Sequence, residues 1–153
     1  MTDQFRQDAL IRQLQGALAG ALSPQAYVPS WTGSGSNPAI GDGTLAGLYF
    51  QVGEIVIVSI NVVAGSTTTF GSGTYNLSLP VPAVAGSRWA LSALVTDAGT
   101  QHYAGTAIIN GGSTFEVIAV GSNSTGPAPW TSTVPFTFGS TDRAVITGCY
   151  AAA

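Results

Sequence analysis

The stretch that decides the fold is Gly47–Pro82, GLYFQVGEIVIVSINVVAGSTTTFGSGTYNLSLPVP. The segment Leu45–Val52, which leads into this stretch, alternates with the period of two that is typical of a β-strand. The pair Gly53-Glu54 then offers a two-residue turn of type II′, because glycine adopts the positive φ of its first position at little cost. These features predict a β-hairpin whose second strand is Ile55–Val63.

The return strand of this hairpin is apolar at consecutive positions over Ile55–Val58, and it alternates only later. Continuous apolar runs are typical of strands that are buried on both faces. We therefore expect Ile55–Val63 to be central in the sheet and covered on both sides. Tyr75–Leu79 alternates cleanly and is predicted to be the next strand, ended by Pro80 and Pro82.

The rest of the chain after residue 24 repeats this pattern of short strands and turns. A short edge strand is expected at Tyr27–Trp31, because Pro29 cannot donate a hydrogen bond to a ladder. The further predicted strands are Arg88–Thr96, Gln101–Ile109, Thr114–Val120, Thr133–Phe138 and Arg143–Tyr150. About nine strands with turn signals every 8 to 12 residues predict an all-β fold, an antiparallel sandwich that is jelly-roll-like.

The one helical pattern lies at the N-terminus, over residues 3–22, and Pro24 ends it. Its apolar residues recur on a period of 3.6. They are Leu10, Ile11, Leu14, Ala17, Leu18, Ala21 and Leu22. Two glycines in the same helix, Gly16 and Gly20, are spaced so that another backbone could approach closely. We divide the chain into this helix, residues 1–24, and one β-sandwich domain, residues 25–153.

An isolated helix of this length is marginally stable, so its apolar stripe must pack on something. One interpretation is an oligomer axis or a helix that docks on a partner. The other is a helix folded onto its own β domain. The first is the interpretation on which the functional prediction below relies.

Charge is unusually sparse, at 7% of residues against roughly 25% in an average soluble domain. The chain has no lysine, and four of its charges lie in the first twelve residues. Such a composition suits a surface that is largely covered by copies of the same chain or by an assembly. A net charge of −3 argues against nucleic-acid binding. No apolar run approaches the roughly 20 residues of a membrane span.

The residues that could take part in catalysis or metal binding have simple structural interpretations. His102, the single histidine, is expected to lie exposed on a strand, and no nucleophile motif accompanies it. Asp42 lies in a short glycine-flanked turn that does not match a calcium loop. Cys149 is expected to be a small buried residue of the last strand. We therefore predict no catalytic site, no metal and no cofactor.

Several segments in order resemble one group of proteins: YVPSWT at residues 27–32, NPAIGDG at 37–43, GLY at 47–49, GSTTTFGSG at 65–73 and LPVP at 79–82. The resemblance is to small β-sandwich virion proteins of tailed actinobacteriophages, of the minor tail, fibre-tip or head-decoration type. It covers residues 27–107 best. It implies a non-enzymatic structural protein, made in the host cytoplasm and placed on the particle surface. The implied partners are two further copies in a homotrimer and other capsid or tail proteins.

An alternative function is adhesion to a glycan on the host surface. Sugar sites on β-sandwiches use exposed aromatic rings for stacking and amide side chains for hydrogen bonds. The candidate contacts are Trp130, expected to be exposed near the end of the loop Gly121–Pro129, together with Asn123 and Trp31. The sequence leaves the structural role and the adhesion role open, because both use the same scaffold.

Overall fold

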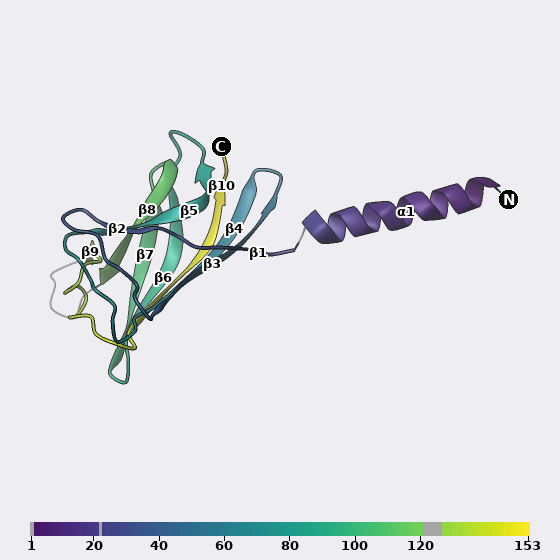
Figure 1. Cartoon of the computed structure of the whole chain (residues 1–153). Coiled ribbons are helices and arrows are strands. Elements are labelled where there is room, and N and C mark those ends of the chain that lie inside the picture. Colours follow the sequence, from purple (N-terminus) through teal and green to yellow (C-terminus); the bar gives the residue numbers. More distant parts are fainter. Residues whose placement is uncertain (1, 22, 121–126) are drawn as a thin grey trace.

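The computed structural model describes residues 2–21, 23–120 and 127–153 (Figure 1). It contains one helix, α1 (Thr2–Ala21), and a sheet of ten strands. The strands are β1 (Gln25–Tyr27), β2 (Trp31–Gly33), β3 (Thr44–Val52), β4 (Ile55–Val63), β5 (Tyr75–Ala83), β6 (Trp89–Asp97), β7 (Gln101–Ile109), β8 (Gly112–Val120), β9 (Pro127–Pro129) and β10 (Arg143–Ala151). The fold is all-β and antiparallel, sandwich-like, with one N-terminal helix, as the sequence predicts.

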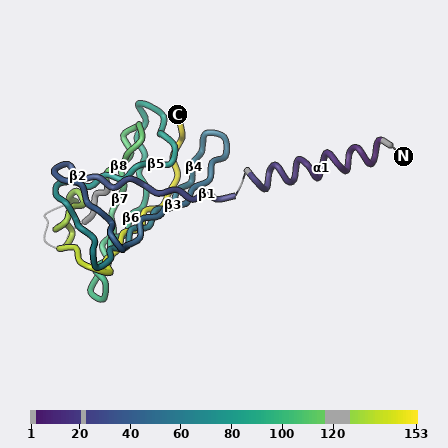
Figure 2. Tube along the Cα trace, viewed as in Figure 1, coloured from purple at the N-terminus to yellow at the C-terminus, as the bar shows by residue number. Residues whose placement is uncertain are grey.

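The strands follow the order β1-β3-β4-β10-β6-β7-β8-β5-β2, and β9 pairs with β8. The sheet curls strongly, so that the end of β5 lies against the end of β10 (Figures 1 and 2). The Val84 amide donates to the carbonyl of Ala151 at 3.0 Å, and the Ala153 amide donates to the carbonyl of Pro82 at 2.9 Å. One continuous sheet therefore forms both halves of the sandwich.

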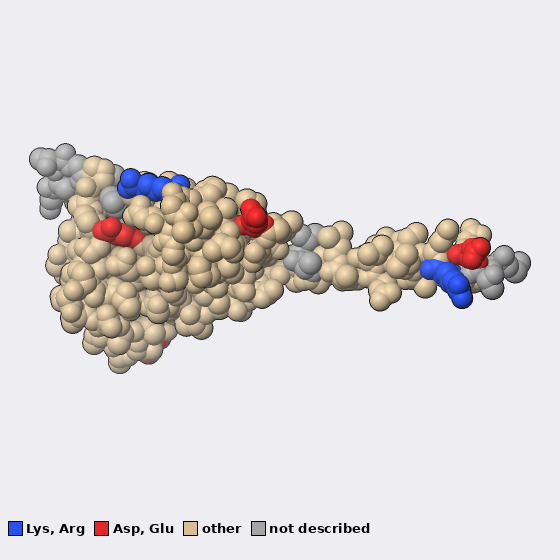
Figure 3. Space-filling view, turned by 90° about the horizontal axis from the view of Figure 1, so that it is seen from above, with Lys and Arg blue, Asp and Glu red and all other residues tan. Residues whose placement is uncertain are grey.

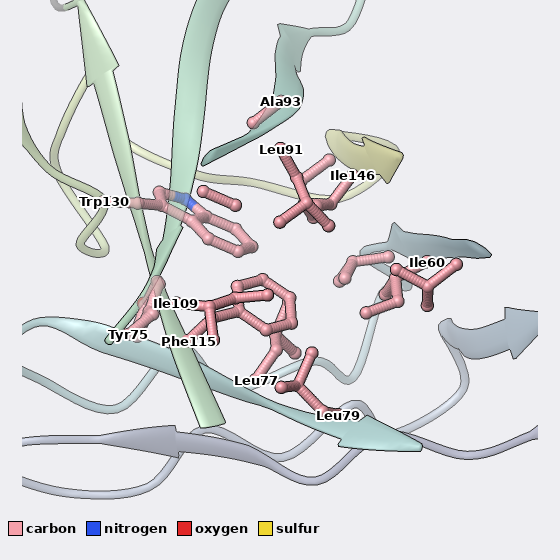
Figure 4. Close-up of a cluster of buried hydrophobic side chains, with 14 of the residues drawn as sticks. Ile60, Tyr75, Leu77, Leu79, Leu91, Ala93, Ile109, Phe115, Trp130 and Ile146 are labelled. Atoms are coloured by element: carbon pink, nitrogen blue, oxygen red, sulfur yellow. The ribbon is translucent and has the colours of Figure 1, made fainter. Parts of the chain in front are cut away.

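The core lies between the two halves of the curled sheet. In β4 every second residue is buried, from Val56 to Val62, because successive side chains of a strand point to opposite faces. Figure 4 shows side chains from β4, β6 and β10 facing side chains from β5, β7 and β8. The labelled residues on the first side include Ile60, Leu91 and Ile146, and those on the second include Leu77, Ile109 and Phe115.

The central hairpin forms as predicted. Gly53 has a φ of 60°, the positive value that the first position of a type II′ turn requires. The register of the hairpin runs from Val52 opposite Ile55 to Thr44 opposite Val63. A substitution at Gly53 would strain the backbone although nothing lies within 4 Å of its missing side chain.

The segment that was predicted as one edge strand, Tyr27–Trp31, is instead two short strands. β1 pairs with β3 at one end of the sheet order, and β2 pairs with β5 at the other end. The residues between them cross from one edge to the other, and Pro29 is buried in this crossing. Each edge of the sheet is thus capped by a short strand, which limits pairing with other chains.

Two further expectations were wrong. β5 does not stop before Pro80 but continues to Ala83, and its register with β8 shifts between Ser78 and Ala83. The prolines lie in this irregular stretch, where their missing N–H groups interrupt no regular ladder. The segment Thr133–Phe138 is not a strand; its only ladder contact is an isolated bridge between Thr131 and Val134.

Candidate functional site

The most unusual surface of the described chain is the helix α1, which Figure 1 shows extending away from the sheet. The predicted helix over residues 3–22 corresponds closely to α1, although Leu22 lies outside the described residues. All described side chains from Asp3 to Gly20 are exposed. The large apolar ones among them are Phe5 (73% exposed), Leu10 (57%), Ile11 (51%), Leu14 (60%) and Leu18 (61%).

We use the name apolar stripe for Leu10, Ile11, Leu14, Ala17 and Leu18, which lie on one side of α1. Every charged residue of the helix precedes this stripe or lies on its other side, and the last charge is Arg12. Figure 3 shows the charged side chains of the helix near its N-terminal end, with uncharged residues from there to the sheet. The stripe therefore offers an apolar contact surface a little over two turns long, about 12 Å.

The glycines of α1 lie on a different side from the stripe. At 100° per residue, Gly16 and Gly20 are rotated by about 200° from Leu14 and Leu18. Nothing lies within 4 Å of the position that a side chain at either glycine would occupy. The leucine side chains and the glycines thus lie on different sides of the helix, with Gly20 at the edge of the stripe, about 60° around the helix from Ala17.

The helix ends in a defined way. The Ser23 amide donates to the carbonyl of Gly20 at 3.3 Å, and its hydroxyl donates to the carbonyl of Ala19 at 3.0 Å. These bonds satisfy two of the carbonyls that a helix end leaves without partners. Pro24 follows immediately and disfavours a helical conformation at Ser23. The chain therefore leaves the helix directly into β1.

A second exposed apolar surface lies on β3, β4 and β10. We define the outer face by six of the side chains on these strands that point away from the core: Leu48 and Phe50 of β3, Ile57 and Ser59 of β4, and Thr147 and Cys149 of β10. They form two rows across the sheet, because Phe50 and Cys149 both pair with Ile57, while Leu48 and Thr147 both pair with Ser59. The exposed fractions of Leu48 and Ile57 are 52% and 42%.

The outer face contains an apolar hollow of about 300 Å³. Its lining is Pro24, Leu48, Tyr49, Phe50, Ile57, Val58, Ser59, Thr147 and Gly148. The depression lies at the row that contains the small side chains of Ser59 and Thr147. The larger side chains of Leu48, Phe50 and Ile57 also line it. Because Pro24 belongs to the lining, the hollow lies where α1 joins the sheet.

These observations correct two sequence predictions. β4 is an interior strand, the third in the order of nine, but it is covered on one face only, and Ile55 and Ile57 on the other face are exposed. Cys149 is exposed rather than buried, since it lies in the outer row opposite Ile57. The apolar residues at consecutive positions of β4 are the sequence signal of this surface, because alternate residues face the core and the rest face outward.

The aromatic residues proposed as glycan contacts are part of the core. Trp130 is 1% exposed and Trp31 is 7% exposed, so the expectation that Trp130 is exposed was wrong. Their rings stack at a centroid distance of 5.8 Å, and Tyr75 contacts both edge-on at 5.0 and 5.1 Å. The strand β9 leads directly into Trp130 and directs it inward. A sugar cannot stack on either ring.

Asn123, the third residue of that set, lies outside the described residues, as does most of the loop Gly121–Pro129 in which it was placed.

The acidic residues of the sheet domain have structural partners. Asp42 is exposed and accepts hydrogen bonds from the Ser66 hydroxyl at 2.7 Å and from the Thr67 amide and hydroxyl at 2.8 Å each. The Ser66 bond, followed by those from Thr67, lowers the pKa of Asp42 to about 2. The buried Asp142 accepts from the Ala98 amide at 2.9 Å and from the Gly139 amide at 2.7 Å. Both carboxylates fasten loops.

His102 is exposed on β7, as predicted, and its Nδ1 lies 3.0 Å from the Thr96 hydroxyl. Within the described residues, no group of three or more His, Cys, Asp and Glu side chains is placed to hold a metal ion. In the same part of the chain, no helix has the length and apolar character needed to cross a membrane.

The sequence matches no protein-family model, and comparisons with curated proteins and with solved structures found no match.

Proposed function

We propose that this chain is a non-enzymatic structural protein of a bacteriophage particle, a minor tail or capsid-decoration protein, and that α1 is its assembly element. The observation that carries the proposal is the exposure of the apolar stripe along α1. The resemblance of residues 27–107 to small actinobacteriophage virion proteins supplies the class of assembly. The proposed location is the particle surface.

The energetics of α1 support an assembly role. Fully burying a leucine or isoleucine side chain contributes about 1.5–3 kcal/mol, so covering the exposed half of each large stripe residue contributes about 1 kcal/mol. An isolated helix of this length is only marginally stable in water. A partner that covers the stripe would therefore stabilise both the helix and the complex.

The scarcity of charge supports the same role. The cores of protein interfaces are depleted of charged residues, and β3, β4 and β10 together carry only Arg143, at one end of β10. Most of the surface visible in Figure 3 is neither acidic nor basic. We propose a homo-oligomer, with three copies as the resemblance implies and with capsid or tail proteins as further partners.

The structure removes the main argument for the alternative function, adhesion to a host glycan. It relied on exposed aromatic rings, and its two leading aromatic candidates, Trp31 and Trp130, are buried. No observation on the described residues favours a glycan site over an assembly surface, so we do not propose that function.

Incorporation into particles tests the proposal. The variant Leu14→Glu/Leu18→Glu places two charges in the stripe while keeping residues that favour a helix. In a phage that encodes this chain, we expect the unaltered protein in purified particles and at least tenfold less of the variant, by quantitative mass spectrometry. The matched control Gln13→Glu/Ala19→Glu puts the same charges outside the stripe and should be incorporated normally. Absence of the unaltered protein from particles would contradict the proposal.

A further inference from the structure

We propose that the apolar hollow on the outer face of β3, β4 and β10 binds the apolar stripe of α1 from a second copy of this chain. The inference rests on the proposed assembly role of α1 and names the surface that receives the helix. It assigns a partner to each of these two apolar surfaces of the described residues.

The shapes of the two surfaces suit each other. The hollow is lined by the small residues Ser59 and Thr147 and by larger side chains that include Leu48 and Ile57. A partner that presented a flat sheet face would leave this depression empty. A row of side chains projecting from a partner's helix can fill it. The stripe supplies such a row, in which Leu14 and Leu18 lie one turn apart.

Both surfaces are also nearly free of charged residues. β3 and β4 contain no charged residue, and β10 contains only Arg143, at the end away from Cys149. The helix carries no charge after Arg12. A partner with a charged contact surface would have to leave those charges without counterparts in an apolar site, which is costly. A second copy of this chain brings a contact surface with no such cost.

The connection between α1 and β1 favours a helix from another copy over the chain's own helix. Three residues separate Ala21 from Gln25, and Pro24 is among them. Proline restricts φ and disfavours a helical conformation at the preceding Ser23. In the structure α1 extends away from the sheet and its described side chains are exposed, so the chain's own stripe does not cover the hollow beside Pro24 (Figure 1).

This contact joins two different surfaces, so each copy contributes its helix to one neighbour and binds the helix of another in its hollow. Contacts of this type close into a ring when the rotation between copies permits, and otherwise they extend as a filament. A ring of three copies would cover all three stripes and all three hollows.

Disulfide cross-linking tests the contact directly, because Cys149 is the natural cysteine of the outer face. In the full chain carrying Leu14→Cys, we expect mild oxidation to give covalent species of two or more chains through Cys149. The matched control Ala19→Cys lies about 140° around the helix from Leu14 and should cross-link at least tenfold less. Equal cross-linking of both variants, or a disulfide within one chain, would overturn the proposal.

Native mass measurements separate this inference from the assembly role of α1. We expect Leu48→Glu and Leu14→Glu/Leu18→Glu each to convert the oligomer to single chains with an unchanged circular dichroism spectrum in the strand region. Val84→Glu, a charge at an exposed apolar residue outside the outer face, should leave the oligomer intact. If the helix variant dissociates the oligomer and Leu48→Glu does not, the hollow is not the site, while the assembly role of α1 stands.

Discussion

At the scale of single residues, buried polar groups do structural work in this protein. Asp142 is 6% exposed, and its two carboxylate oxygens receive amides from two different segments, those of Ala98 and Gly139. This one side chain therefore fastens the β6–β7 turn to the segment that leads into β10. A carboxylate in that position is explained by architecture and needs no catalytic role.

Asp142→Asn should destabilise the fold by about 2 kcal/mol. The substitution replaces one acceptor oxygen by an NH2 group that must face an amide donor, and hydrogen bonds to a charged group contribute about 1.5–3 kcal/mol. Urea denaturation followed by tryptophan fluorescence measures the change. Asp8→Asn on the exposed helix is the matched control and should change the free energy of unfolding by less than about 0.5 kcal/mol. Equal effects of the two substitutions would contradict the assigned role.

Trp130→Ala should destabilise the protein by about 3–5 kcal/mol, because it opens a cavity among buried aromatic rings. The half-buried Trp89, whose indole N–H donates to the Ser87 hydroxyl at 2.9 Å, provides a matched control. Trp89→Ala should cost clearly less in the same denaturation experiment. A wild-type stability of the Trp130→Ala variant would mean that this ring is not part of the core.

The carboxyl of Asp42 should titrate with a pKa of about 2, well below the ordinary aspartate value. A lowered folded-state pKa contributes stability above the unfolded pKa near 4, and this stability is lost as the pH falls toward 2. Ser66→Ala removes the largest cause and should raise the pKa of Asp42, as observed by carbon-detected NMR titration. An unchanged Asp42 titration curve in the Ser66→Ala variant would contradict the assignment.

At the scale of elements, the sequence predicts the features that depend on neighbouring residues, such as turns, and misses those that depend on distant strands. The hairpin at Gly53-Glu54 was predictable because the turn needs one positive φ that glycine supplies. The split of Tyr27–Trp31 into β1 and β2 was not, since it depends on strands far apart in the sequence that pair with each half. The continuation of β5 past Pro80 likewise depends on a register shift with β8.

Of the two candidate surfaces, one is predictable from the sequence and the other is not. The stripe on α1 is a periodic pattern within one helix, so the sequence contains it. The outer face is built from three strands that are far apart in the sequence, and only the register of β3, β4 and β10 brings Phe50, Ile57 and Cys149 into one row. The burial of Trp130 was also unpredictable locally, because its neighbour Trp31 comes from the opposite end of the chain.

Gly16→Ala/Gly20→Ala should stabilise α1, because each glycine in an exposed helix costs about 1 kcal/mol relative to alanine and both positions have open space. Helix content should rise in circular dichroism of the full chain, and the oligomer should persist, since the stripe is on another side. Ala19→Gly is the reverse control and should lower helix content. Loss of the oligomer in the alanine variant would show that the glycine side forms the contact.

At the scale of the whole molecule, the chain is a well-packed sandwich with two uncovered apolar surfaces, α1 and the outer face. Charges make up 7% of residues, and four of them lie in the first twelve, so solubility of the sheet domain of a single copy would depend mainly on serine, threonine, asparagine and glycine. Covering both apolar surfaces in an assembly accounts for the composition, for the unpaired stripe and for the one-sided burial of β4 together.

The native mass of the purified full chain tests this account most directly. The account predicts one discrete oligomer, a multiple of 15.4 kDa, at low micromolar concentration. It also predicts dissociation of that oligomer to single chains in Leu14→Glu/Leu18→Glu, with Gln13→Glu/Ala19→Glu unaffected. A monodisperse single chain for the unaltered protein, or an oligomer that both variants leave intact, would contradict the claim that the apolar stripe of α1 assembles copies of this protein.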